Sequence, residues 1–147
     1  MTSGEGPCLL CLGGPLSGDD AIALLVGEEL ARRGVRVGLA PDTSRLLDLL
    51  SEPADYVVVD AAVGITRGSV EEVTARALLR SAPAVSSHGL DVEVVLTLAT
   101  RLWTAPGSVR LIGIGLGESP RLDAVSTDLR SRLRSIADDV FALAVRR

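Results

Sequence analysis

The sequence predicts an α/β fold: one three-layer α/β/α domain over residues 1–147, built on a mostly parallel, twisted sheet of about five strands. Short apolar runs alternate with stretches of helical periodicity, which is the pattern of strand–helix–strand units. Hydrophobic residues make up 47% of the chain, but it has only one Trp, one Tyr and one Phe. The core must therefore be built from Leu, Val, Ala and Ile, which suits a parallel sheet buried beneath helices.

The elements follow from these runs in chain order. Apolar and β-branched runs predict strands, whereas apolar residues at helical spacing predict the helices between them. The spacing within 70–80 allows either a helix or an irregular strand, and we favour the strand. The expected order is strand 8–12, helix 18–33, strand 35–39, helix 42–52, strand 56–60, the ambiguous segment 70–80, turn 86–89, helix 91–103, strand 109–114 and helix 122–145.

The loop between the first strand and the first helix carries two adjacent carboxylates, Asp19 and Asp20. A glycine turn before a helix often binds phosphate through free backbone N–H groups, but carboxylates at that place repel an anion and attract a cation. Two nucleotide-binding patterns also fail when they are started at Gly13. The dinucleotide-binding pattern needs a glycine where Pro15 stands, and the Walker pattern needs a lysine where Asp19 stands. We interpret this loop as a cation or substrate site.

Further polar residues are expected at the same edge of the sheet. Asp60 ends a middle strand and His88 lies in a turn before a helix, and ligands of such sheets bind beyond the carboxyl ends of the strands. Two carboxylates and one imidazole form a suitable set for nickel, zinc or a similar divalent ion. Each residue also has a structural interpretation: Asp20 as a helix cap paired with Ser17, Asp60 as a turn residue and His88 as an ordinary loop residue.

Composition excludes several other classes. The net charge is −4 and no basic segment is interleaved with aromatic residues, so we expect no nucleic-acid partner. No apolar run approaches the roughly 18 residues of a membrane span, and the first residues lack the basic region of a signal peptide, so we expect a cytoplasmic protein with no membrane contact. Cys8 and Cys11 lie on opposite faces of one apolar strand, which favours two buried structural cysteines over a redox or zinc pair.

Five segments match a known family pattern in order and spacing: 10–22, 57–61, 64–70, 86–90 and 109–114. In these segments the chain resembles the hydrogenase maturation endopeptidases, which remove the C-terminal tail of the nickel-loaded large subunit of [NiFe] hydrogenases. The resemblance implies that Asp20, Asp60 and His88 contact nickel that arrives with the substrate, although other divalent metals can occupy such a site. It makes Asp20 and Asp60 the candidate catalytic residues, and the hydrogenase large-subunit precursor the partner of a monomeric enzyme.

The chain also departs from the pattern of that family. Gly14 replaces an asparagine, Arg67 replaces a proline, and the segment 40–43 replaces an acidic loop thought to help recognise substrate. Asp42 in that segment, with Gly64 and Gly68, is a candidate substrate-binding residue. Two further hypotheses therefore stand beside the protease: a relative that binds metal or precursor without cleaving it, and a plain α/β binding domain whose acidic residues only cap helices.

Overall fold

The structure, a computed structural model, confirms the predicted α/β class. It describes residues 6–13, 18–73, 97, 107–118, 121 and 124–146, with Asp20 and Thr43 described by their backbone alone. The elements are β1 (Cys8–Leu12), the 3-10 helix η1 (Gly18–Ala21), α1 (Ile22–Arg32), β2 (Val37–Ala40), α2 (Thr43–Leu49), β3 (Tyr56–Val63), β4 (Val70–Val73), β5 (Val109–Gly117), α5 (Thr127–Ser131) and α6 (Leu133–Ala144).

The described strands form one five-stranded sheet in the order β2-β1-β3-β5-β4. Four strands run parallel, and β4 pairs with β5 in the antiparallel sense at one edge. The expectation of a mostly parallel sheet is therefore confirmed. The choice of strand for the ambiguous segment is confirmed over Val70–Val73, while the rest of 70–80 lies outside the described residues.

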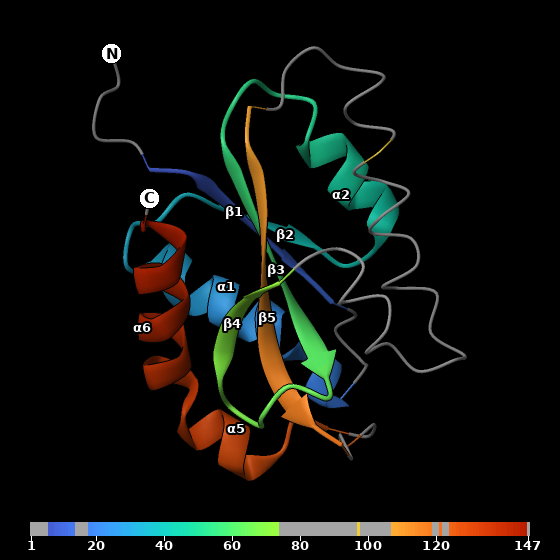
Figure 1. Ribbon diagram of the computed structural model, residues 1–147, viewed down its shortest axis with the longest axis vertical. Coiled ribbons are helices and arrows are strands. Elements are labelled where there is room, and N and C mark those ends of the chain that lie inside the picture. The colour runs from blue at the N-terminus through green and yellow to red at the C-terminus, as the bar shows by residue number, and fades with distance from the viewer. Residues whose placement is uncertain are drawn as a thin grey trace.

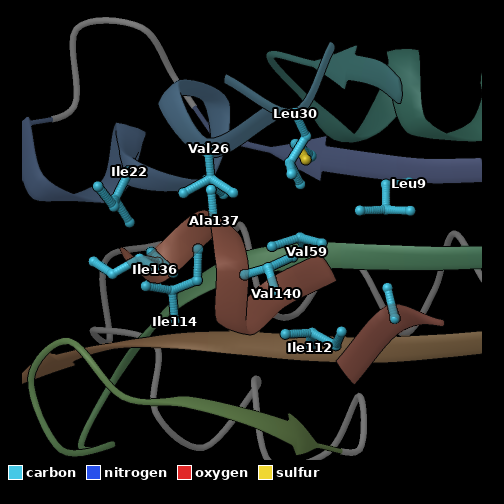
Figure 2. Packing of buried hydrophobic residues seen from close by; sticks show 14 of the residues in the cluster. Leu9, Ile22, Val26, Leu30, Val59, Ile112, Ile114, Ile136, Ala137 and Val140 are labelled. Carbon is cyan, nitrogen blue, oxygen red and sulfur yellow. The ribbon is translucent and has the colours of Figure 1, made fainter. Parts of the chain in front are cut away.

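Helices cover both faces of the sheet (Figure 1), with α1 and α6 on one face and α2 on the other. Val59, Ile112 and Ile114 of the sheet point toward Val26 of α1 and Val140 of α6 (Figure 2). The opposite face buries Leu10, Val58 and Leu111 against Leu46 and Leu50 at α2. Successive strand residues alternate between these two clusters, as the period of a strand requires.

The alternation also settles where the two cysteines lie. Cys11 is fully buried in the cluster beneath α1, and Cys8 packs at the edge of the opposite cluster. Both are free thiols; the expectation of two buried cysteines is confirmed for Cys11, whereas Cys8 is only partly buried. Burial raises the pKa of the Cys11 thiol to about 12, so this sulfur stays protonated and unreactive.

Strand β3 does not end at Asp60, which corrects the sequence interpretation. Its pairing with β1 stops at Val59, but its pairing with β5 continues to Val63. The chain then turns over the end of β5 and returns along its other side as β4, so β5 lies between two strands that are consecutive in sequence (Figure 1). Backbone hydrogen bonds hold this crossing segment on β5: Gly64 N to Gly117 O (2.9 Å), Gly117 N to Ile65 O (2.9 Å), Gly68 N to Gly115 O (2.9 Å) and Gly115 N to Ser69 O (2.8 Å).

The sequence of β5 allows this close crossing. Gly113, Gly115 and Gly117 alternate with large apolar residues, so one face of the strand end has no side chains. A Cβ atom at Gly115 would collide with the backbone of Thr66 and would lie 2.7 Å from the carbonyl oxygen of Ile65. The glycine alternation is therefore required by the segment 64–69, which rests directly on the strand.

The C-terminal helix differs from the expectation of one helix over 122–145. Helix α5 begins at Thr127, and α6 follows after a break at Arg132, whose backbone (φ −103°, ψ 10°) lies outside helical geometry. Residues 124–126 are not helical, because the backbone N–H and the hydroxyl of Ser126 donate to Asp19 across the molecule. Apolar residues keep helical spacing in the sequence through 124–126 and through Arg132, so the pattern gave no sign of either interruption.

Two other expectations lie mostly outside the described residues. The turn at 86–89, with His88, is not described, and of the expected helix 91–103 the structure describes only Thr97, which is helical. Within the described part of the chain, no helix is both long enough and apolar enough to cross a membrane.

Candidate functional site

The start of the first helix is organised around the carboxylate of Asp19, which is fully buried. Its Oδ1 accepts a hydrogen bond from the backbone N–H of Ser126 (2.7 Å). Its Oδ2 accepts from the backbone N–H of Arg121 (2.8 Å), the Ser126 hydroxyl (3.0 Å) and Nη2 of Arg67 (3.2 Å). The Asp19 N–H donates in return to the carbonyl of Arg121 (2.9 Å). This set of bonds fixes the turn that enters α1.

The surroundings keep Asp19 ionised. Burial by itself raises the pKa of this carboxyl, but the hydrogen bonds from Arg121, Ser126 and Arg67 outweigh it and hold the pKa below its ordinary value. A buried carboxylate is stable only when donors satisfy it, and here both oxygens are satisfied. Asp19 is therefore a structural anchor of the helix start.

The next residue, Asp20, is one of the three expected metal contacts. Its backbone lies in η1, which packs against β3, so the helix start and the strand of Asp60 meet at the carboxyl edge of the sheet. The Asp20 side chain and all of His88 lie outside the described residues. The predicted trio of Asp20, Asp60 and His88 thus stays a prediction.

Asp60 is described fully, and the residue is 3% exposed. It is the first residue of β3 beyond the pairing with β1, and its Oδ1 accepts a hydrogen bond from the backbone N–H of Ala61 (2.8 Å). Strand alternation places it on the α2 side of the sheet, with Val58 and Ala62. Among the described side chains, no group of three or more His, Cys, Asp or Glu is placed to hold a metal ion.

The candidate substrate-binding residues have identifiable structural roles. Gly64 and Gly68 adopt positive φ (95° and 81°), the left-handed region that favours glycine, at the two bends of the crossing segment. The guanidinium of Arg132 lies against Gly68, where a Cβ atom would collide with it. Asp42 caps α2, since its Oδ1 accepts from the backbone N–H of Arg45 (2.9 Å). A substrate contact by any of the three stays a prediction.

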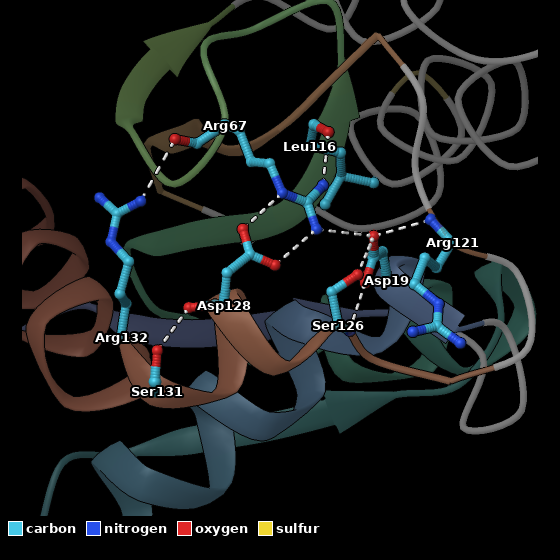
Figure 3. Close-up of polar contacts among 8 residues, drawn as sticks. All are labelled: Asp19, Arg67, Leu116, Arg121, Ser126, Asp128, Ser131 and Arg132. Carbon is cyan, nitrogen blue, oxygen red and sulfur yellow. Dashed lines mark hydrogen bonds and ion pairs between the residues drawn. The ribbon is translucent and has the colours of Figure 1, made fainter.

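Arg67 joins the helix start to the crossing segment, a role that sequence reasoning missed (Figure 3). Its Nε and Nη2 donate to the two oxygens of Asp128 (2.7 and 3.0 Å), and its Nη1 donates to the carbonyl of Leu116 (2.9 Å). Hydrogen bonds to Asp128, and then to Asp19, raise the pKa of Arg67 above its usual range. These partners lie 48 to 61 residues away in sequence, so local pattern offers no signal for them.

A groove of about 1220 Å³ lies at the opposite, amino ends of the strands and so is separate from this edge. Its lining includes Arg33 and Arg110, whose charges are already compensated. Arg33 pairs with Glu29 and Asp138, and Arg110 pairs with Glu72 while donating to the last carbonyls of α6. The groove brings no acid–base or metal-ligating cluster to the described surface.

The fold is that of the hydrogenase maturation proteases, so the resemblance inferred from the motifs is confirmed at the level of the fold. The structure of the [NiFe] hydrogenase maturation protease HybD from Thermococcus kodakarensis superposes with a TM-score of 0.71 at 22% identity, covering 93% of this chain and 97% of that chain. The hydrogenase maturating endopeptidase HybD from E. coli gives a TM-score of 0.70 at 20% identity, covering 92% and 90%.

A third solved structure extends over almost the whole sequence. The [NiFe] hydrogenase maturation protease HycI from Thermococcus kodakarensis KOD1 covers 99% of this chain and 96% of its own, with a TM-score of 0.68 and 22% identity. No protein-family model and no curated protein matches the sequence. At such low identity the likeness concerns the fold, and the chemistry must be argued from the residues of this chain.

Proposed function

We propose that this chain is an endopeptidase that removes the C-terminal tail of the nickel-loaded large subunit of a [NiFe] hydrogenase during maturation. The observation that carries the proposal is the meeting of the acidic helix start with the strand of Asp60, on a fold shared with solved maturation proteases over nearly the whole chain. The enzyme acts as a monomer in the cytoplasm, and its partner is the hydrogenase precursor.

The proposed chemistry assigns nickel to the substrate. Asp20, Asp60 and His88 contact a nickel ion already held by the precursor, and these oxygen and nitrogen donors suit a borderline divalent ion. Sharing the ion between precursor and protease fixes the tail beside the carboxyl edge, which lowers the entropic cost of bringing the scissile bond to Asp20 and Asp60. Asp19 anchors this helix start and is not itself a ligand, since its two oxygens already have protein donors.

The crossing segment supports substrate binding in the same proposal. It is a rigid surface at the carboxyl edge, because backbone hydrogen bonds hold it on β5 between Gly64 and Ser69. An extended tail can approach the backbone closely at Gly64, where nothing lies within 4 Å of the position of a side chain, and it meets the Arg132 guanidinium at Gly68. Asp42 lies at the head of α2, where an exposed carboxylate can meet the precursor while it caps the helix.

The test is mass spectrometry of a nickel-loaded large-subunit precursor incubated with the protein. We expect loss of one C-terminal peptide with the unmutated chain, and no loss with Asp20→Asn, Asp60→Asn or His88→Ala. Asp139→Asn is the matched control, because it makes the same acid-to-amide change on the exposed side of α6 and should cleave like the unmutated chain. An unchanged precursor mass, with nickel confirmed in the precursor, would overturn the protease proposal.

The second candidate is a relative that binds the precursor or its metal without cleavage. It is favoured by the segment 40–43, where Asp42 acts as a helix cap in place of the acidic loop of the family. Co-sedimentation of the chain with nickel-loaded precursor, combined with an intact tail, identifies this case. Failure to bind nickel, zinc or cadmium at micromolar levels, together with no co-sedimentation, leaves the plain α/β binding domain.

A further inference from the structure

The guanidinium of Arg67 connects three parts of the chain that meet at the carboxyl edge (Figure 3). Arg67 belongs to the crossing segment between β3 and β4, while its partners are Asp19 in η1, Asp128 in α5 and the Leu116 carbonyl in β5. All three guanidinium nitrogens donate. An arginine fork can serve several acceptors in fixed directions at once, whereas a lysine ammonium cannot reproduce that planar geometry.

The two carboxylates that Arg67 joins differ in their surroundings. Asp19 has a fully buried side chain, whereas the Asp128 side chain is 52% exposed and that of Arg67 is 29% exposed. An exposed ion pair is weakened by solvent and salt, so the contact with Asp128 is worth little by itself. The contact with Asp19 is different, because a buried carboxylate that loses a charged partner is left with less compensation in a medium of low polarity.

The segment that carries Arg67 is itself held rigidly. Backbone hydrogen bonds fix it on β5 at Gly64 and Gly68, and the Arg132 guanidinium covers its outer side, donating to the carbonyl of Arg67 (3.5 Å). The guanidinium of Arg67 therefore projects from a fixed base toward Asp19. Any movement of η1 relative to this base must break or lengthen the bond between Nη2 of Arg67 and Oδ2 of Asp19.

We propose that Arg67 is a positioning residue, which locks the acidic helix start at residues 18–21 to the crossing segment at residues 64–69 and so fixes Asp20 relative to the bound tail. The inference rests on the proposed function, in which Asp20 contacts the nickel and Gly64 and Gly68 accommodate the tail. Its own content is the coupling between the two segments through Asp19. A small misplacement of one catalytic segment against another lowers the rate without unfolding the protein.

The variants separate this coupling from general stability. Arg67→Gln removes the charge and the fork, whereas Arg67→Lys keeps the charge near Asp19 but cannot serve Asp19, Asp128 and the Leu116 carbonyl together. Asp128→Asn is the matched control, since it weakens the exposed partner of Arg67 and leaves the contact with Asp19 in place. All are assayed well below the temperature at which circular dichroism first detects unfolding.

The first readout is steady-state cleavage of the nickel-loaded precursor. We expect Arg67→Gln to lower kcat/KM by about tenfold or more. Compared with Arg67→Gln, Arg67→Lys should restore a larger share of the lost thermal stability than of the lost kcat/KM. The kcat/KM of Asp128→Asn should stay within about twofold of that of the unmutated chain. The inference is overturned when folded Arg67→Gln cleaves within twofold of the unmutated chain, or when Asp128→Asn is as impaired as Arg67→Gln.

The second readout does not depend on cleavage. Hydrogen exchange of the Arg121 and Ser126 backbone amides, which donate to Asp19, reports directly on the helix start. We expect about tenfold or greater loss of protection at these amides in Arg67→Gln and little change in Asp128→Asn. If the unmutated chain fails to cleave, the proposed function fails, but this measurement still tests the coupling of the helix start to the crossing segment. Unchanged protection of these amides in Arg67→Gln overturns that coupling.

Discussion

Substitution of Gly115 by alanine tests whether the crossing segment depends on the glycine alternation of β5. The new Cβ would collide with the backbone of Thr66, and it would lie 2.7 Å from the carbonyl oxygen of Ile65, whereas ordinary contact begins at 3.4 Å. The segment must therefore retreat by at least about 0.7 Å. The hydrogen bonds from Gly68 N to Gly115 O and from Gly115 N to Ser69 O, at 2.9 and 2.8 Å, cannot both survive that movement.

The expected cost follows from these contacts. Loss of at least one backbone hydrogen bond contributes about 1 kcal/mol, and overpacking adds about 1–3 kcal/mol, so we expect Gly115→Ala to lower the free energy of unfolding by about 2–4 kcal/mol. Urea denaturation followed by circular dichroism measures this change, and exchange of the Gly68 amide shows whether the loss is local.

A matched substitution lies two residues earlier on the same face. At Gly113 an added Cβ would meet side chains, Cδ1 of Ile65 at 3.1 Å and Cβ of Ala62 at 3.3 Å, which can adjust more easily than backbone. We expect Gly113→Ala to cost less than about 1.5 kcal/mol. If Gly115→Ala unfolds within 0.5 kcal/mol of the unmutated chain, or costs no more than Gly113→Ala, the crossing segment is not held as described.

Three further outcomes are expected. The pKa of Asp19 is lowered in the folded protein, so its ionisation stabilises the fold above the ordinary carboxyl pKa of about 3.9. This contribution is lost as the pH falls through the lower folded pKa. Asp19→Asn should therefore be less stable at neutral pH, and its urea midpoint should fall less steeply at acid pH than that of the unmutated chain. Iodoacetamide at pH 8 should leave Cys11 of the native protein unmodified and modify Cys8 slowly, since burial raises the pKa of both thiols. Both cysteines should react in urea. Rapid labelling of Cys11 in the native protein, seen by peptide mass spectrometry, would contradict its burial. Asp42→Ala should lower the free energy of unfolding by about 1 kcal/mol through loss of the cap to the Arg45 amide, and Asp42→Ser should restore most of it, which denaturant titration can resolve.

The sequence was sufficient for the parts of the fold that depend on local pattern. The strand starting at Tyr56, the strand starting at Val109 and the helix starting at Thr43 all begin at or within a residue of where periodicity and capping residues place them. The class and the mostly parallel sheet follow because alternating strands and helices of this length have few ways to bury their apolar faces.

The errors have long-range causes. Residues 124–126 lie before the helix that begins at Thr127, because Asp19, more than a hundred residues earlier, binds the N–H and the hydroxyl of Ser126 and holds its backbone extended. The break at Arg132 carries no glycine or proline, so nothing in the local sequence marks it. Strand β3 passes Asp60 because β5 offers it a partner there, although β1 does not.

For the candidate site, too, the sequence located local features and missed partners that lie far apart in the chain. The sequence places Asp19 and Asp20 at the helix start, and the structure gives Asp19 a structural role there. Arg67 was noted only as a departure from a family pattern, because its significance comes from partners that the sequence places far away. Ion pairs between residues far apart in the chain, such as those of Arg67 with Asp19 and Asp128, leave no local signal in the sequence.

The position of β5 between β3 and β4 has a consequence for the order in which the chain can fold. Strands β3 and β4 are separated by a short turn, yet they cannot pair as a hairpin because residues 109–117 must lie between them. During synthesis the edge of β3 therefore waits unpaired until most of the chain has left the ribosome. Contacts of such sequence separation form slowly, and an exposed apolar strand edge promotes association with other chains during that wait. The crossing segment at the carboxyl edge therefore reaches its final position late, after β5 has joined the sheet, and chains that stop before residue 109 cannot hold it there.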